Sequence, residues 1–387
     1  MGKALLIIVA GFSVIFSGVV FNLTSSQSRS AQEIVIQHEK WIARNAAESA
    51  ANVGIAKIYQ DINDLSWSGL SGTFNDASYS ITATNVTTDS INEAKRISIL
   101  ALTTFAEEAD SSIAVLIEPA YSYYNFFTRE WPNHRTFSTG DTLWGPLHTN
   151  DRIKISGTPV FISKVSSGNA NFDPSGANPK CYGGAEMGAT SISSPDLIPI
   201  RSEAGADEYN DGLTLTFNAD GTYDYVSGAL SGTKQISDYN GIIRTTNDED
   251  IHVQGVVNGQ VTVVSDQDIY IDNNIVYFDN PISNVNSDDF LGLVAKNDVI
   301  INKSGAVTIH AAILMKEIFR FPQKGSNAIK QPLIIVGSLG QRNEEDPTFL
   351  VIGGYQIKLI ADPRLRSRTP PYFPRVTNRV EQVYRSK

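Results

Sequence analysis

Residues Ala4–Leu23 read ALLIIVAGFSVIFSGVVFNL and contain no Lys, Arg, Asp, Glu or His. At a rise of about 1.5 Å per residue, a helix over this stretch can cross the roughly 30 Å hydrocarbon core of a bilayer. The sequence therefore predicts a retained transmembrane helix, and Lys3 favours a cytoplasmic N-terminus with an exported body. The residues predicted to contact the membrane are Leu5, Leu6, Ile7, Ile8, Val9, Phe12, Ile15, Phe16, Val19, Val20 and Phe21.

Two other interpretations of this stretch remain open. A cleaved secretory signal usually has an apolar region of about 7 to 15 residues and a small-x-small cleavage site. The run here is longer and no Ala-x-Ala follows it, although the polar segment Ser25–Ser30 is compatible with cleavage. The third interpretation, a buried helix of a globular domain, seldom stays free of charge over so many residues.

Composition limits the classes of partner and site. The formal net charge of -10 argues against binding to nucleic acid, which needs clustered Lys and Arg, so we expect no nucleic acid partner. The single cysteine, Cys181, excludes an intramolecular disulfide and a zinc site made of several cysteines. A length of 387 residues allows two or three domains, and the membrane segment must therefore carry a folded body.

The helical pattern continues beyond the apolar run, over residues 27–62, without any proline. Small and apolar side chains recur at steps of three or four, which predicts an amphipathic stem helix. The Ala-rich segment Ala43–Ile58 permits close approach of another helix or of the sheet that follows, or packing on the helix's own domain. The residues predicted to pack are Val35, Ile42, Ala46, Ala50 and Val53.

An apolar helix that runs into a stem with the core NAAESAAN, Asn45–Asn52, resembles the N-terminal region of type IV pilins, particularly the large minor pilins of the PilX kind. The resemblance implies that the apolar half packs in the filament core or waits in the inner membrane, with the globular part displayed outside. It implies as partners the lipid bilayer and other pilin-like subunits or pilus assembly proteins.

Major pilins carry Glu as the fifth residue after a leader that ends in Gly. Cleavage after Gly2 would place Ile7 there, and cleavage after Gly11 would place Phe16 there. Neither residue is acidic, and this departure favours a special, minor subunit over the bulk subunit of a filament.

Three segments after the stem have the alternating or apolar pattern of strands: Ala77–Val86, Arg96–Thr104 and Ser112–Ile117. A small antiparallel sheet packed on the stem is the simplest way to bury both apolar faces. An aromatic connector, residues 121–137, follows together with Trp144. It could form a surface for a sugar or another ligand, or a buried hinge.

Internal similarity predicts the architecture of the remaining chain. Val263–Asp272 (VVSDQDIYID), Leu293–Asn302 (LVAKNDVIIN) and Leu147–Ser156 (LHTNDRIKIS) each have an apolar start, a polar turn and an Ile/Val-x-Ile strand. Ile251 and Val253 repeat the pattern eighteen positions before Ile269 and Ile271. This indicates a β-solenoid, in which stacked rungs bury a continuous core, and a β-sandwich is the alternative.

The predicted fold class is α+β, with a mainly β domain after the helix. The predicted domains are a transmembrane and stem helix (1–64), a small sheet (65–120), a solenoid head (121–340) with an inserted loop and hairpin excursion (157–240), and a C-terminal strand with a Pro-rich strap or tail (341–387). Within the excursion, Asn218–Gly221 predicts the turn of a hairpin.

No catalytic, cofactor-binding or metal-binding residues are predicted. The histidines, His134 and His148 among them, are dispersed without ligand spacing. Six acids could converge in a solenoid and serve an enzyme or bind calcium, but turn positions explain them more simply. They are Asp248, Glu249, Asp250, Asp266, Asp268 and Asp272.

The sequence thus predicts a non-enzymatic, membrane-anchored protein of the cell envelope without a cofactor, acting in pilus assembly, at a filament tip or in surface adhesion. The alternative function is a membrane-tethered or secreted solenoid enzyme or binding protein acting on polysaccharide. Convergent acids in a groove beside aromatic platforms would favour the enzyme.

Overall fold

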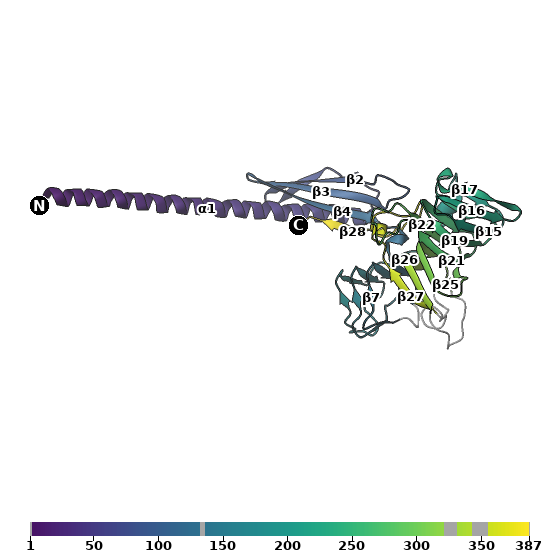
Figure 1. The fold of residues 1–387 in the computed structure, drawn as a ribbon. Helices are drawn as coiled ribbons and strands as arrows, with labels where there is room; N and C mark the ends of the chain where they lie inside the picture. Colours follow the sequence, from purple (N-terminus) through teal and green to yellow (C-terminus); the bar gives the residue numbers. More distant parts are fainter. Residues whose placement is uncertain (1, 132–135, 321–330, 343–354, 387) are drawn as a thin grey trace. The chain divides into compact units, whose positions relative to one another are not determined.

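A computed structural model describes residues 2–131, 136–320, 331–342 and 355–386 (Figure 1). The chain forms two compact units. The first consists of Met1–Val86, Arg96–Ile117 and Gln382–Lys387, and the second of Thr87–Lys95 and Glu118–Glu381. A long N-terminal helix followed by a mostly β region is confirmed, and His134 lies outside the described residues.

The first unit is built on α1, a continuous helix over Gly2–Gln60. The apolar run and the amphipathic stem are thus parts of one helix, as the sequence predicts. Proline is absent from this segment, so nothing removes a backbone hydrogen bond along it. The helix ends at Gln60, before the turn-forming residues that lead into the sheet.

The C-terminal part of α1 lies along a five-stranded sheet (Figure 1) with the order β1-β2-β3-β4-β28. Antiparallel pairing joins β1 to β2, with Leu70 opposite Ile81, and β2 to β3, with Ser80 opposite Leu102. The three predicted strands are confirmed as β2, β3 and β4, and the two edge strands of the sheet are β1 and β28. The strands are β1 (Leu70–Phe74), β2 (Ala77–Asn85), β3 (Lys95–Phe105), β4 (Glu108–Glu118) and β28 (Glu381–Arg385).

Small residues bring α1 close to this sheet. A Cβ atom at Gly54 would lie 2.8 Å from Ile99 Cγ2, closer than real Cβ atoms approach, and 3.1 Å from Ile81 Cγ2, which is also a tight contact. The Thr103 hydroxyl donates to the Ala43 carbonyl at 2.7 Å, and Arg385 Nη1 donates to Asn52 Oδ1 at 2.7 Å. The buried helix residues on this side are Ala43, Ala46, Ala47, Ala50, Ala51, Ile55 and Ile58.

Substitution Gly54→Leu is expected to lower the free energy of unfolding of the first unit by about 1–3 kcal/mol, because the new side chain overpacks the interface with stiff, β-branched isoleucines. The matched control is Gly18→Leu, since Gly18 lies in the same helix with nothing within 4 Å. Hydrogen exchange of the β2 and β3 amides measures the effect. Equal exchange in both variants would show that the close approach at Gly54 does not exist.

The second unit is mainly β. Its strands are β5 (Phe126–Thr128), β6 (Phe137–Ser138), β7 (Thr142–Leu143), β8 (Leu147–Thr149), β9 (Ile155–Ser156), β10 (Val160–Phe161), β11 (Val165–Ser167), β12 (Lys180–Cys181), β13 (Ala185–Met187), β14 (Asp207–Tyr209), β15 (Leu213–Phe217), β16 (Thr222–Ser227), β17 (Leu230–Gln235), β18 (Ile242–Thr245), β19 (Ile251–Val257), β20 (Gln260–Ser265), β21 (Ile269–Tyr277), β22 (Phe290–Ala295), β23 (Val299–Ile301), β24 (Val307–Met315), β25 (Phe319–Arg320), β26 (Gln331–Gln341) and β27 (Tyr355–Ile360). Its helices are α2 (Ile198–Ser202) and 3₁₀ turns at Tyr121–Tyr123, Ile236–Asp238 and Pro363–Arg366.

Most of these strands pair in parallel with the equivalent strand of the next repeat. Val263 lies opposite Leu293, and Ile269 lies opposite both Ile251 and Val299, which is the register that the internal repeats predict. Parallel pairing from repeat to repeat is what a solenoid requires, whereas sandwiches are built from antiparallel sheets. The predicted hairpin is also confirmed, because β15 and β16 pair antiparallel on either side of the Asn218–Gly221 turn.

The large, mainly parallel sheet of the second unit is called the ladder below, and the order of its strands differs from their order in the chain. Ile313 of β24 lies opposite Leu339 of β26, Leu339 lies opposite Phe126 of β5, and Phe126 lies opposite Leu147 of β8. Strand β5, the first of the unit, therefore lies between the late strand β26 and the early strand β8. Strands β10–β13 fall in the segment predicted as an excursion. There β11 and β13 extend the ladder from β8 in parallel, whereas β10 and β12 form a separate parallel sheet with β7.

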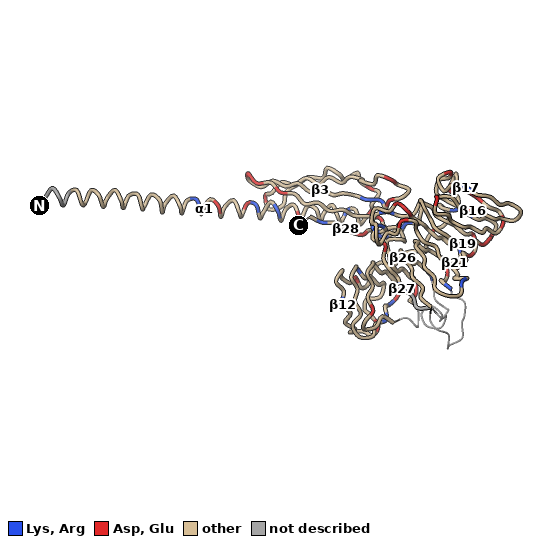
Figure 2. Tube along the Cα trace, in the orientation of Figure 1, with Lys and Arg blue, Asp and Glu red and all other residues tan. Residues whose placement is uncertain are grey.

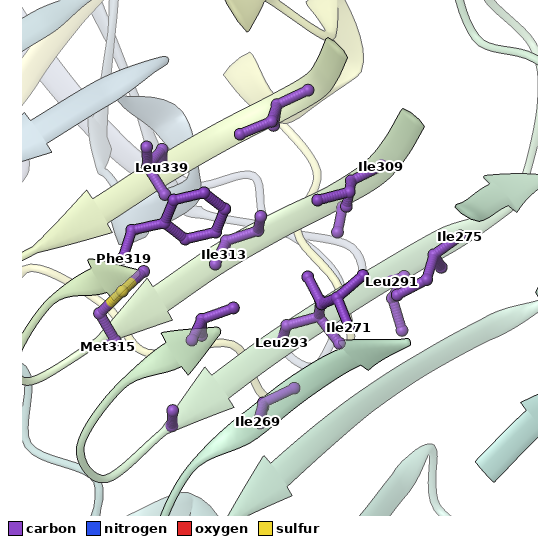
Figure 3. Packing of buried hydrophobic residues seen from close by; sticks show 14 of the residues in the cluster. Ile269, Ile271, Ile275, Leu291, Leu293, Ile309, Ile313, Met315, Phe319 and Leu339 are labelled. Atoms are coloured by element: carbon purple, nitrogen blue, oxygen red, sulfur yellow. The ribbon is translucent and has the colours of Figure 1, made fainter. Parts of the chain in front are cut away.

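Inward-facing side chains from successive strands form one core, and Figure 3 shows Ile269, Ile271, Leu293 and Ile313 packed side by side. The connector is mostly buried in the cores of the second unit, which favours the buried alternative over an exposed ligand surface for Tyr121, Tyr124, Phe126, Phe127, Trp131 and Phe137. Of the predicted rung residues, Val256 is half-buried. The buried ones are Val253, Val261, Val263, Ile269, Ile271, Ile275, Tyr277, Val299, Ile301, Val307, Ile309, Ile313 and Leu314.

The Pro-rich C-terminal segment is a strap across the outer side of this ladder. Phe373 packs in a second cluster with Phe290 and Val264, and a Cβ atom at Gly292 would lie 2.8 Å from the Phe373 ring. The buried Arg364 guanidinium binds the Asp362 carboxylate through several hydrogen bonds and lies 4.3 Å from the centre of the Phe290 ring. The strap is thus held by apolar burial and a paired charge.

Candidate assembly surface on the N-terminal helix

The N-terminal half of α1 exposes nearly all of its apolar side chains. Ile7 is 73% exposed and Phe16 is 72% exposed. Between Lys3 and Arg29 this half carries no charged residue, and Figure 2 shows the long uncharged stretch in tan. The predicted membrane residues Ile8, Val9, Phe12, Ile15, Val19, Val20 and Phe21 are likewise exposed, and Leu5 and Leu6 lie in the same helix.

The exposed residues cover the whole circumference of the helix. Successive helical residues are about 100° apart, so Ile7, Ile8 and Val9 face three different sides. The Ser13 hydroxyl donates to the Val9 carbonyl at 2.9 Å, and the Thr24 hydroxyl donates to the Val20 carbonyl at 2.8 Å. These polar groups are satisfied within the helix, as a membrane environment requires. Among the described residues, α1 is the one helix whose length and composition suit a membrane span.

The predicted stem residues divide between two environments. Ala46 and Ala50 are buried against the helix's own sheet, and Ile42 and Val53 are half-buried. Val35 is 54% exposed. The predicted set omits Val14 and Leu23, which are as exposed as their neighbours. Both residues lie in the uncharged run, and this position in the sequence could have identified them. The apolar residues of 7–23 are called the assembly surface below.

The acids that could have formed an active site instead bind backbone groups at the corners of the ladder. Asp250 Oδ1 accepts the Asp268 N–H at 3.0 Å, and Asp268 Oδ1 accepts the Asp298 N–H at 2.9 Å. Asp298 Oδ1 in turn accepts the Ile318 N–H at 2.9 Å. Burial raises the pKa of the Asp268 carboxyl, and the neighbouring carboxylates of Asp298 and Asp250 add to the shift. Each carboxylate therefore joins one repeat to the next.

Three more acids of this set have side-chain partners, and Glu249 takes part through its backbone carbonyl, which accepts from the Thr245 hydroxyl at 2.8 Å. Asp248 pairs with Lys296, and Asp266 pairs with Arg201. Asp272 lies 2.9 Å from His252 Nδ1. Within the described residues, no group of three or more His, Cys, Asp and Glu side chains could hold a metal ion. This arrangement favours the corner interpretation of the acids over an active site.

His148 is fully buried in the core. Its Nδ1 lies 2.8 Å from Ser166 Oγ and its Nε2 lies 3.0 Å from Asn150 Oδ1, while the ring stacks on Phe127. Burial and, to a smaller extent, the nearby Arg379 guanidinium lower the pKa of the imidazole to about 4. Ser166 is also buried, so this serine and histidine pair cannot reach a substrate and has a structural role.

The depressed pKa of His148 predicts a pH-dependent stability. Between pH 6.5 and about 4 the unfolded chain binds a proton that the folded chain does not, so stability falls as pH falls. Lowering pH from 7 to 5 should cost the wild type about 2 kcal/mol more than the variant His148→Gln. Urea unfolding at the two pH values measures this, and equal losses in both proteins would contradict a neutral, buried His148.

No model of a protein family matches the chain, and no curated protein matches it. Among solved structures, the chain is similar to the crystal structure of the competence-associated pilin ComZ from Thermus thermophilus. The sequence identity is 10%, the match covers 90% of this chain and 97% of that chain, and the TM-score is 0.38. The geometry of α1, and not this likeness, is what bears on function.

Placing charges in the assembly surface should release the protein from membranes. The double variant Ile15→Arg/Phe16→Arg puts two cations in the centre of the span, at about 3 kcal/mol each. The matched control is Ile34→Arg/Val35→Arg, at exposed positions of the same helix beyond the span. Fractionation should find the first variant depleted from carbonate-washed membranes and the control retained. Equal retention of both would mean that residues 7–23 do not cross the bilayer.

Proposed function

We propose that this protein is a pilin-like structural subunit, held in the cell envelope by α1, that acts in type IV pilus assembly, at a filament tip or in surface adhesion. The observation that carries the proposal is the division of α1. Its C-terminal half packs on its own sheet, whereas its N-terminal half has an apolar surface that the described chain leaves uncovered. A bilayer covers such a surface before assembly, and other apolar helices cover it afterwards.

The proposal extends to the kind of subunit. Neither Ile7 nor Phe16 supplies the acidic fifth residue that major pilins carry, which supports a minor subunit over a bulk one. Lys3 on the N-terminal side supports an orientation with the N-terminus inside and the body periplasmic or extracellular. The partners proposed are the lipid bilayer, other pilin-like subunits or assembly proteins, and a surface ligand.

We infer that the second unit is a β-solenoid displayed by the stem, with domain boundaries near 64, 120 and 340. The parallel register Ile251–Ile269–Val299 supports this assignment. A structural, non-enzymatic role is supported by the hydrogen bonds of Asp250 and Asp268, whose carboxylates are occupied by backbone N–H groups. The head thus supplies a rigid surface, and α1 supplies the attachment.

Site-specific photo-crosslinking tests the filament role. A p-benzoylphenylalanine at position 16 should cross-link to a pilin-like subunit in sheared filaments, because Phe16 lies in the assembly surface. The matched control is the same probe at Tyr182, an aromatic residue that is also 72% exposed but lies in the second unit. It should give no cross-link to the N-terminal helix of a subunit. Cross-links from position 16 to lipid alone would mean that α1 serves only as a membrane anchor, and they would contradict the filament role.

A further inference from the structure

Two adjoining cavities lie on either side of Trp144 in the second unit. The larger, about 550 Å³, is lined by Asp141, Thr142 and Lys358 among others, and the smaller, about 250 Å³, by Tyr123, Asn125 and Arg366 among others. Trp144 and Ala361 line both. The two cavities therefore form one elongated site with an aromatic side chain in the middle.

Trp144 differs from the aromatic residues of the connector. The buried ones lie in the core, whereas Trp144 is 60% exposed between β7 and β8. A Cβ atom at Gly145 would lie 2.2 Å from Asn125 Cβ and 2.9 Å from Ala361 Cβ. Glycine at this position thus lets the chain after Trp144 pass against the cavity wall. The exposed indole is held on a segment that is packed firmly behind it.

The wall of the smaller cavity contains buried polar groups without partners. Asn125 is 2% exposed and its Nδ2 donates to the Gly337 carbonyl at 2.8 Å, but its Oδ1 has no hydrogen-bond partner. Ser122 is 1% exposed and its Oγ also has no partner. Such groups are rare in native proteins and cost about 1–3 kcal/mol each. Both atoms lie beneath the surface of the cavity wall, so the polar groups that face a ligand there are those of the half-buried Tyr123 and the exposed Arg366.

The charges of the site restrict the class of ligand. The lining contains two cations, Lys358 and Arg366, and the acids Asp141 and Asp362, of which Asp362 is paired with Arg364. Nucleic acid requires many clustered cations, and among the described residues the lining of this site contains only Lys358 and Arg366 beside Asp141. A purely apolar ligand would leave the hydroxyl and charged groups without partners.

We propose that this site binds an oligosaccharide, with one sugar ring on the Trp144 indole and its neighbours in the two cavities. A sugar ring combines a flat face of C–H groups, which packs on an aromatic ring, with a rim of hydroxyls that both donate and accept. Tyr123 and Arg366 line the site on one side for these hydroxyls, and Asp141 and Thr142 line it on the other. The inference concerns the second unit alone and does not depend on the filament role.

Saturation-transfer NMR on the full chain in phospholipid nanodiscs tests the proposal, since detergents with sugar headgroups would compete. The probes are cellohexaose, chitohexaose and oligogalacturonate, which represent neutral, acetylated and acidic chains. We expect the wild type to saturate the ring protons of at least one probe. Variant Trp144→Ala should weaken that binding about tenfold or more, because a central aromatic contact is lost.

Two further variants separate a binding role from a structural one. Trp41→Ala is the matched control, because Trp41 is 62% exposed but lies on α1, and it should bind like the wild type. Trp144→Phe retains an aromatic face and should retain most of the affinity. The proposal is overturned if no probe is saturated by the wild type, or if Trp144→Ala binds as tightly as Trp41→Ala.

Discussion

An apolar helix must be covered, and this requirement governs the rest of the structure. The C-terminal half of α1 meets it within the chain, because Gly54 and the alanines near it let the helix approach Ile81 and Ile99. The N-terminal half carries large side chains such as Phe16 on all sides, and the described chain does not cover them. Burial of each such side chain contributes roughly 1.5–3 kcal/mol. That free energy is available for anchoring and association.

The second unit depends on a different constraint, which is the pairing of β26 with β5. Leu339 lies opposite Phe126, so strands distant in sequence complete one ladder. The strap adds to this closure through Phe373 and the buried pair Arg364–Asp362. The Trp144 site lies beside this junction, because β27 contributes Lys358 and the start of the ladder contributes Asn125. A rigid junction is a suitable place for a site with fixed walls.

The sequence predicted the elements that form one uninterrupted run or that repeat along the chain. The uncharged run and the absence of proline predicted α1, and the shared Asp-containing corners predicted that Ile251, Ile269 and Val299 align. The junction of Leu339 with Phe126 carries no shared motif, because pairing between distant strands depends on the path of the whole chain. Nor could the pattern separate exposed Trp144 from the buried aromatic residues around it. The membrane and stem residues, Phe16 and Ala46 among them, stay predictions as partner-binding residues.

The most direct test of the account is the intact mass and N-terminal sequence of the protein recovered from sheared surface filaments and, separately, from membranes. The account predicts that both forms retain Ala4–Leu23, with or without a short leader removed, because in the proposed function this segment is the surface for anchoring and assembly. Recovery of a soluble secreted chain without the whole segment would contradict it.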